Sequence, residues 1–296
     1  MNRALPPKVL SIAGSDSGGG AGIQADLKAF ARSGVHGMTA ITAITAQNTV
    51  AVTGVYPVPP EAIVEQVRAV AEDIGVDAVK IGMLGTAETI AAVDRALDLV
   101  GDAPVVLDPV MVAESGARLL DEDAEDALRT RLLPRATVVT PNIAEARVLA
   151  GGTAAGQPGR PAAAGQAGGE PDAESGACRA EAERTPGDLA RAVHRLGPRA
   201  VVVTGGHRDE PTDLFFDGER LVEIPGERHP GGASHGSGCT HSSTLAAQLA
   251  LGREPLEAAR EAKRIAAEAV RDGLRGLGGG AGPVNALGLG RPRRPG

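Results

Sequence analysis

The chain is poor in aromatic residues: among its 296 residues are Tyr56, three phenylalanines and no tryptophan. A ligand with a flat ring would therefore be held mainly by aliphatic side chains, methionine and backbone, because the usual stacking partners are nearly absent. Lysine is also scarce and occurs only at Lys8, Lys28, Lys80 and Lys263, so arginine carries most of the positive charge. Each lysine is therefore a position to inspect individually.

Cysteine occurs only at Cys178 and Cys239, and cysteine and histidine form no cluster with the spacing of a metal site. Two cysteines without a secretion signal are weak support for a disulfide. The net charge of −7 and the scattered basic residues argue against nucleic acid as a partner. No apolar run has the length of a membrane span and no cleavage-site pattern is present, so we expect a cytoplasmic protein without a membrane partner.

Strand-length apolar runs alternate along the chain with longer runs of helical period, such as 9–13 before 21–33 and 78–81 before 86–100. This alternation predicts an α/β fold, with a mostly parallel central sheet and helices on both faces. The length allows one large domain or two small ones, and we interpret 1–296 as a single domain. The stretch 151–185 is rich in Gly, Ala, Pro and Arg without any period, so we interpret it as a disordered surface insertion.

In parallel sheets, ligands bind beyond the carboxyl ends of the strands, so the residues that follow each strand are the first candidates for a site. The strand at 9–13 leads into a Gly-rich loop at 14–22 that opens a helix. This loop lacks the Gly-Lys-Ser/Thr of a P-loop and matches Gly-x-Gly-x-x-Gly only loosely. We interpret it as a loop packed over a small ligand, with a plain flexible connection as the alternative.

Two further residues at strand ends have both a binding and a structural interpretation. The amide of Gln47 donates and accepts hydrogen bonds, as recognition of a heteroaromatic ring requires, but the residue alone favours a turn cap. Met83 follows the strand at 77–81 and has a soft side chain that can cover a flat ring, although filling the core is the commoner role of methionine.

Oxygen-bearing side chains follow two other strands. Asp108 comes directly after 105–107, and Asn142 and Glu145 come after 137–140. Asn142 and Glu145 have the spacing of a capping box, which is a structural role at a helix N-terminus. The functional alternative is that the three residues meet at one rim and hold Mg²⁺ through water, because this ion prefers oxygen ligands.

The stretch at 235–243 reads His-Gly-Ser-Gly-Cys-Thr-His-Ser-Ser and enters an apolar helical run at 244–249. Glycine lets backbone N–H groups converge on one point, and the positive end of the helix favours negative charge there. The pattern predicts an anion hole at Gly236, Ser237 and Gly238, with Cys239 as a nucleophile-type side chain beside it. The alternative is an ordinary helix start with a small core cysteine.

The ordered set of these motifs resembles the hydroxymethylpyrimidine/phosphomethylpyrimidine kinases of thiamine biosynthesis, in the ribokinase-like superfamily. The motifs lie at 13–28, 46–49 (Ala-Gln-Asn-Thr), 80–84 (Lys-Ile-Gly-Met-Leu), 140–142 (Thr-Pro-Asn), 205–207 (Gly-Gly-His) and 235–240. The resemblance covers about 9–284 except the insertion. It implies a ribokinase-like fold, a homodimer, and MgATP-dependent phosphorylation of 4-amino-5-hydroxymethyl-2-methylpyrimidine and then of its monophosphate.

The resemblance also implies roles for individual residues. Gln47 would hydrogen-bond the pyrimidine, and its pocket would be lined by Gly14, Asp26, Met83 and Val110. The residues assigned to the nucleotide are Asn142, Thr204, Gly206 and His235, and those assigned to Mg²⁺ are Asp108 and Glu145.

Cys239 stands where sugar kinases of the superfamily carry an aspartate base. A helix N-terminus lowers the pKa of a thiol, so we expect a thiolate that accepts the proton of the substrate hydroxyl. Backbone N–H groups from Gly236 to Cys239 would stabilise the charge that develops on the transferred phosphoryl group.

The chain departs from the family pattern at three positions. Thr204 and Glu114 occupy positions where the family often has lysine, and His241 occupies a position that is often apolar. Two fewer cations near a polyanion would weaken charge balance unless arginines compensate, and the candidates are Arg118, Arg208 and Arg228. This loss bears more on the second phosphorylation than on the first.

Three other functions compete with this interpretation. A pyridoxal-type kinase is the nearest, because pyridoxal also carries a hydroxymethyl arm on a substituted ring. A non-catalytic pyrimidine-binding regulator is suggested by Thr204 and Glu114. A cysteine hydrolase is the weakest, because no acidic or amide partner is placed by any motif to orient His235 or His241 as a base.

Overall fold

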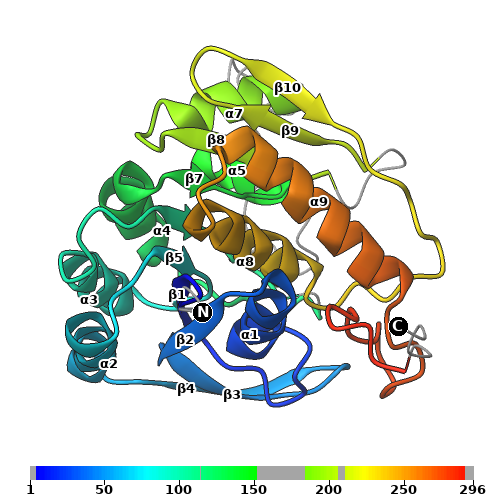
Figure 1. Ribbon diagram of the computed structural model, residues 1–296, viewed down its shortest axis with the longest axis horizontal. Helices are drawn as coiled ribbons and strands as arrows, with labels where there is room; N and C mark the ends of the chain where they lie inside the picture. The colour runs from blue at the N-terminus through cyan, green and yellow to red at the C-terminus, as the bar shows by residue number, and fades with distance from the viewer. Residues whose placement is uncertain (1–4, 114, 152–183, 206–210, 291–296) are drawn as a thin grey trace, which may run out of the picture.

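An eight-stranded sheet with the strand order β10-β9-β8-β7-β6-β5-β1-β2 forms the centre of the protein (Figure 1). The computed structural model describes residues 5–113, 115–151, 184–205 and 211–290. The strands are β1 (Lys8–Ala13), β2 (His36–Ile41), β5 (Ala78–Ile81), β6 (Val105–Leu107), β7 (Val138–Val139), β8 (Ala200–Val203), β9 (Asp213–Phe216) and β10 (Leu221–Ile224). Pairing is parallel from β2 through β8 and antiparallel for β8–β9 and β9–β10. The predicted mostly parallel α/β sheet is confirmed.

Helices cover both faces of this sheet, as the alternation of apolar runs predicts. One face packs against α1 (Gly22–Ser33), α8 (Ser237–Ala250) and α9 (Pro255–Arg271). The other face packs against α2 (Pro60–Asp73), α3 (Ala87–Leu97), α4 (Ala124–Ala127) with the short turns η1 (Leu128–Leu132) and η2 (Leu133–Arg135), α5 (Ile143–Leu149) and α7 (Pro186–His194). Within the described ranges, no helix is long and apolar enough to cross a membrane.

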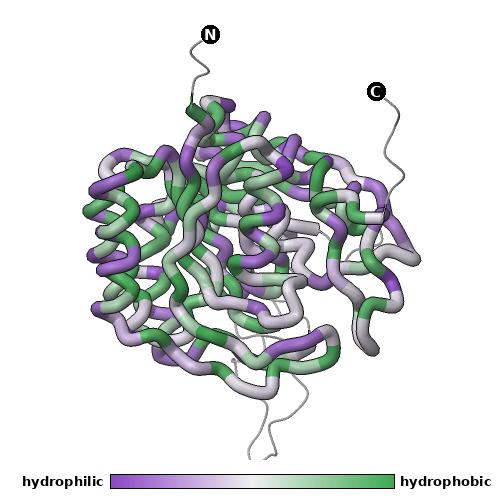
Figure 2. The backbone as a smooth tube through the Cα atoms, turned by 60° about the horizontal axis from the view of Figure 1, so that its bottom comes forward, coloured by the Kyte–Doolittle hydropathy of each residue, from purple (hydrophilic) through white to green (hydrophobic). Residues whose placement is uncertain are grey.

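Successive strand residues supply the cores on the two faces, because side chains alternate across a strand. Leu10 and Ile12 of β1 belong to the core beneath α2 and α3, whereas Val9 belongs to the core beneath α8 and α9. Both faces are buried, so the parallel strands are largely apolar and not alternately polar, with the buried Ser11 and Lys80 as exceptions. The outer helices α2 and α3, on the left of Figure 2, alternate between hydrophilic and hydrophobic residues, as helices with one buried face do.

A separate two-stranded antiparallel hairpin, β3 (Ala43–Gln47) and β4 (Val52–Pro57), leaves the edge of the main sheet after β2. It lies below α1 in the view of Figure 1. Its position brings Gln47 to the first Gly-rich loop: the hydroxyl of Ser17 donates to the carbonyl of Gln47 (2.6 Å), and the N–H of Gln47 donates to that hydroxyl (2.9 Å).

Some sequence predictions fall outside the described residues. They concern Gly206, Glu114, Arg208 and nearly all of the stretch 151–185. The interpretation of 151–185 as an insertion stays a prediction.

Candidate active site

The carboxyl ends of the parallel strands deliver the predicted residues to one edge of the sheet. Gly14 follows β1, Met83 follows β5, Asp108 follows β6, Asn142 follows β7 and Thr204 follows β8. The N-terminal part of α8 reaches the same edge, because the hydroxyl of its Ser242 donates to a carboxylate oxygen of Asp108 (2.9 Å). The strand ends and the predicted anion hole therefore meet.

The start of α8 has the backbone geometry of an anion site. Gly236 precedes the helix with a φ of 84°, and a Cβ at this position would overlap the carbonyl oxygen of Gly20, so the turn requires glycine. The N–H of Thr240 makes the first helical bond, to the carbonyl of Gly236 (2.9 Å). The preceding N–H groups of Gly238 and Cys239 have no acceptor within the helix. A Cβ built on Gly238 would meet no atom within 4 Å, so open space lies beside these donors.

The thiol of Cys239 differs from the prediction made for it. Burial raises its pKa to about 12, and the negative charges of Asp26 and Asp108 act in the same direction against the lowering effect of the Lys80 ammonium. The expected resting thiolate is therefore wrong, because burial and two carboxylates outweigh the helix terminus. The backbone N–H of Gly22 also hydrogen-bonds the thiol, which places Cys239 against the first Gly-rich loop.

A buried ion pair lies close to Cys239. Lys80 and Asp26 are both fully buried, and the Lys80 Nζ atom lies 3.0 Å from each oxygen of the Asp26 carboxylate. The hydroxyls of Ser11 and Ser243 each donate to one of these oxygens at 2.6 Å. Although burial alone would lower the pKa of Lys80, the charges of Asp26 and Asp108 raise it well above its usual range.

These contacts place Asp26, which the resemblance assigns to the pyrimidine pocket, beneath the site with both oxygens occupied by protein donors. Sequence reasoning assigned no role to Lys80. Its signal was a lone lysine, one of very few in the chain, inside an otherwise apolar strand.

Apart from Asp26, the residues assigned to the pyrimidine come from the first loop (Gly14), the hairpin (Gln47) and the segments after β5 (Met83) and β6 (Val110). Gly14 and Met83 are in direct contact, since a Cβ on Gly14 would overlap the methyl group of Met83. The hydroxyl of Thr42 donates to the Met83 carbonyl (2.7 Å) and so fixes its backbone. Gln47 and Val110 are both partly exposed.

His235 is buried against the first loop. Its Nε2 lies 3.0 Å from a carboxylate oxygen of Asp16 that also accepts from the N–H groups of Gly20 (2.9 Å) and Ala21 (2.7 Å), while the other oxygen accepts from the N–H of Gly18 (2.8 Å). Burial would raise the pKa of Asp16, but the hydrogen bonds from His235, Ala21 and Gly18 lower it on balance. The resemblance assigns His235 to the nucleotide, and the structure adds a contact that joins the first loop to the anion hole.

Asp108 and Glu145 form a pair of buried carboxyls. Burial and the charge of Asp108 raise the pKa of Glu145 to about 8, although N–H groups of Asn142 and Met111 oppose the rise. Burial also raises the pKa of Asp108 above its ordinary value despite the opposing effects of Lys80 and Ser242. Two neighbouring carboxyls whose ionisation is disfavoured by burial are suited to share a divalent cation, which compensates their charge.

The predicted capping box of α5 is also present. The N–H of Asn142 donates to Glu145 and the N–H of Glu145 donates to the Asn142 side chain, both at 2.9 Å. Across the part of the chain that the structure describes, no group of three or more His, Cys, Asp or Glu residues could hold a metal. The two carboxyls fit Mg²⁺ only if water or phosphate oxygens complete its coordination, which is how this ion is usually bound.

Among the residues that the resemblance assigns to the nucleotide, Thr204 pairs with Asn142 in a parallel bridge, and the N–H of Thr204 donates to the carbonyl of Pro141 (2.9 Å). Arg118 is paired with Glu122 and Glu125 at 3.1 Å, so its charge is already directed to two carboxylates.

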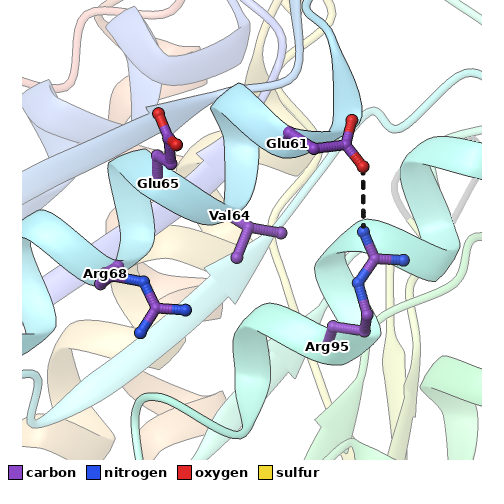
Figure 3. Close-up of a pocket in the computed structure, with 5 residues that line it drawn as sticks. All are labelled: Glu61, Val64, Glu65, Arg68 and Arg95. Atoms are coloured by element: carbon purple, nitrogen blue, oxygen red, sulfur yellow. Dashed lines mark ion pairs between the residues drawn. The ribbon is translucent and has the colours of Figure 1, made fainter.

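A surface depression between α2 and α3 lies apart from these residues. It is lined by Glu61, Val64, Glu65, Arg68 and Arg95, and an ion pair of 3.7 Å joins Glu61 to Arg95 (Figure 3). None of these residues belongs to the strand-end set.

The family model for phosphomethylpyrimidine kinase matches residues 16–167 and 176–285. The chain belongs to the phosphomethylpyrimidine kinase family. A Rhizobium meliloti relative named hydroxymethylpyrimidine/phosphomethylpyrimidine kinase is 48% identical over 280 residues, which are 93% of this chain and 95% of that protein. A Bacillus subtilis relative of the same name is 41% identical over 281 residues, 94% of each chain. The predicted resemblance is confirmed, and the chain is a kinase.

Solved structures of the phosphomethylpyrimidine kinase family and of pyridoxal kinases share this fold. An ADP complex of Bacillus subtilis pyridoxal kinase has a TM-score of 0.79 at 34% identity and covers 96% of this chain and 98% of its own. The phosphomethylpyrimidine kinase of Clostridium difficile 630 has a TM-score of 0.69 at 36% identity, with coverage of 89% and 99%. The ribokinase-like architecture is thereby confirmed.

Proposed function

We propose that this family member uses ATP to phosphorylate the hydroxymethyl group of 4-amino-5-hydroxymethyl-2-methylpyrimidine and then phosphorylates the monophosphate, in thiamine biosynthesis. One observation carries the proposal: the open N-terminus of α8, with Cys239 in its first turn, meets the strand ends that hold Met83 and Asp108. Relatives that are 40–48% identical over nearly the whole chain carry the corresponding name.

Phosphoryl transfer mainly requires positioning and stabilisation of negative charge. The N–H groups of Gly238 and Cys239 have no acceptor within the helix and the space beside Gly238 is open, so a phosphoryl group placed there would contact them. The buried ammonium of Lys80 adds a fixed positive charge beneath this point. These groups are in place before substrate binds, so little reorganisation accompanies the reaction.

The hydroxyl oxygen of the pyrimidine attacks the γ-phosphorus, a new P–O bond forms, and the bond to the bridging oxygen of ADP breaks. The hydroxyl proton passes to the sulfur of Cys239, which is partly exposed and must first release its own proton to water. The Lys80 ammonium stabilises that thiolate, whereas Asp26 and Asp108 oppose it. Mg²⁺ held by Asp108 and Glu145 through water would supply positive charge for the phosphates and offset the charge of Asp108.

The pyrimidine ring is proposed to lie against Met83 and the first loop, where the methyl group of Met83 contacts Gly14 and must turn aside for a ring to enter between them. Gln47 at the end of β3 supplies an amide that can both donate to and accept from the ring. Val110 completes an apolar edge. Asn142, Thr204, Gly206 and His235 are proposed for the nucleotide on the family pattern.

The β3–β4 hairpin is the proposed contact surface of a homodimer. Ile44 and Tyr56 are directly opposite each other across the two strands and are 55% and 65% exposed. Two large apolar side chains paired on an exposed hairpin face favour burial against a second copy. Light scattering should give twice the monomer mass for the wild type and a smaller mass for Ile44→Asp; a wild-type monomer would contradict the proposal.

The function is tested by a coupled assay with MgATP and three acceptors: the pyrimidine alcohol, its monophosphate and pyridoxal. Turnover of both pyrimidines is the expected result. Turnover of pyridoxal alone would favour the second candidate function, that of a pyridoxal kinase. This candidate is included because solved pyridoxal kinases share the fold. Binding of the pyrimidine without phosphorylation of any acceptor would instead favour a non-catalytic binding protein.

A further inference from the structure

Three neighbouring residues of α8 each contact a different buried carboxylate. Ser243 donates to Asp26 (2.6 Å) and Ser242 donates to Asp108 (2.9 Å), both within the site described above. The third, His241, places its Nε2 3.3 Å from an oxygen of Asp213, at the start of β9. His241 lies two residues after Cys239, but its contact with Asp213 has no part in the mechanism described above.

Asp213 is almost fully buried, and its two oxygens have different neighbours. One oxygen accepts from the Lys263 ammonium on α9 (2.6 Å) and from the backbone N–H of Gly205 (2.9 Å), and the other faces His241. The side chains of Lys263 and His241 are themselves largely buried. The carboxylate therefore joins β9, α8 and α9 to the residue that follows Thr204 at the end of β8.

The hydrogen bond between Asp213 and Gly205 matters because Gly205 follows directly after Thr204. A Cβ at this position would overlap the carbonyl oxygen of Thr212, so the two backbones are in close contact beside Asp213. Thr204, the preceding residue, forms the bridge to Asn142, and both are proposed for the nucleotide. A carboxylate that fixes Gly205 also fixes this bridge relative to the anion hole on α8.

Burial alone would raise the pKa of Asp213, but the contacts with His241 and Lys263 bring it below its ordinary value. The side chain is therefore charged at neutral pH. A charged acceptor makes stronger hydrogen bonds than a neutral one, so the N–H of Gly205 is held more firmly than it would be by a neutral acceptor.

We propose that Asp213, held by Lys263 and His241, is a positioning residue for nucleotide binding that sets the end of β8 against the anion-hole helix. The proposal rests on the proposed kinase function. It assigns a specific task to His241, which stands where related kinases often have an apolar residue. It also shows how a lysine contributes near the nucleotide although position 204 is threonine: Lys263 acts through Asp213 and not by direct contact.

The test compares Asp213→Asn with wild type and with Asp217→Asn. Asp217 follows the same strand and pairs with Arg220 (2.6 Å) in the β9–β10 turn. Asp217→Asn is therefore the same change of side chain at a position without a link to Gly205. Asparagine can still accept from the Gly205 N–H but loses the charge that Lys263 and His241 face. We expect KM for ATP and Kd for ADP to rise about tenfold, equivalent to about 1.4 kcal/mol, while KM for the pyrimidine changes less than twofold. Asp217→Asn should leave all three unchanged.

A second pair of variants keeps the test decisive if Asp213→Asn does not fold. Lys263→Met should raise Kd for ADP in calorimetry, and Lys263→Arg, which retains the charge, should restore most of the affinity. Equal ADP affinity in wild type, Asp213→Asn and Lys263→Met would overturn the positioning role and leave the kinase function intact. Equal losses for ATP and pyrimidine would show a general structural effect and would also overturn it. If the wild type bound no ADP, the kinase function itself would fail and the positioning role with it.

Discussion

Replacing Lys80 by methionine should strongly destabilise the protein, because it leaves the Asp26 carboxylate buried without its counter-ion. Both side chains are fully buried, and the ammonium lies 3.0 Å from both carboxylate oxygens. Only the hydroxyls of Ser11 and Ser243 would remain as donors. Breaking a buried pair from one side costs about 3–5 kcal/mol, and we expect a loss of this size in the free energy of unfolding.

The measurement is urea unfolding of wild type, Lys80→Met, Asp26→Asn and the double variant, with the slope of the transition as a check on two-state behaviour. The double variant removes both charges and should recover much of the loss, since neutral replacement of a buried pair is often close to neutral in stability. A surface substitution, Arg68→Met, removes a cation from an exposed i,i+4 pair and should cost less than about 1 kcal/mol. A loss below about 1 kcal/mol for Lys80→Met, or additive losses in the double variant, would refute this reasoning.

Three other predictions concern the site. The pKa of Glu145 is raised to about 8, so the contribution of this carboxyl to stability is fully present below pH 4.5 and is lost as the pH rises through about 8. The resulting fall in the free energy of unfolding has an upper bound of about 5 kcal/mol. Glu145→Gln should flatten this pH dependence. An identical pH profile in the variant would contradict the assignment. Because burial raises the pKa of Cys239 to about 12, its alkylation by iodoacetamide should still accelerate between pH 9 and 10; a plateau near pH 7 would indicate a thiolate at rest. Gly236→Ala should lower both the melting temperature and kcat, because φ is 84° and a Cβ would overlap Gly20; unchanged values would show that this turn is not required.

Much of the fold was predictable from local pattern. Alternating apolar runs indicated the parallel sheet, and the capping-box spacing of Asn142 and Glu145 placed the start of α5. The glycines before Cys239 indicated the start of α8. These signals are local because hydrophobic period, capping and glycine conformation act over a few residues.

The contacts that set the chemistry were not predictable in this way. Lys80 and Asp26 are 54 residues apart and His235 and Asp16 are 219 apart, so their pairing depends on strand order and not on spacing. The predicted thiolate at Cys239 failed for the same reason. The rule for helix termini is local, whereas burial and carboxylates from other elements determine the pKa of this thiol.

The most direct test follows transfer of the γ-phosphoryl group to the pyrimidine alcohol in a single turnover by wild type, Cys239→Ala and Cys239→Ser. If Cys239 accepts the hydroxyl proton, transfer should be rapid in wild type and slower by about 10²–10⁴-fold in Cys239→Ala. The affinities for pyrimidine and ATP should stay within about threefold of wild type. Transfer by Cys239→Ala at the wild-type rate would contradict the assignment of this thiol as the proton acceptor.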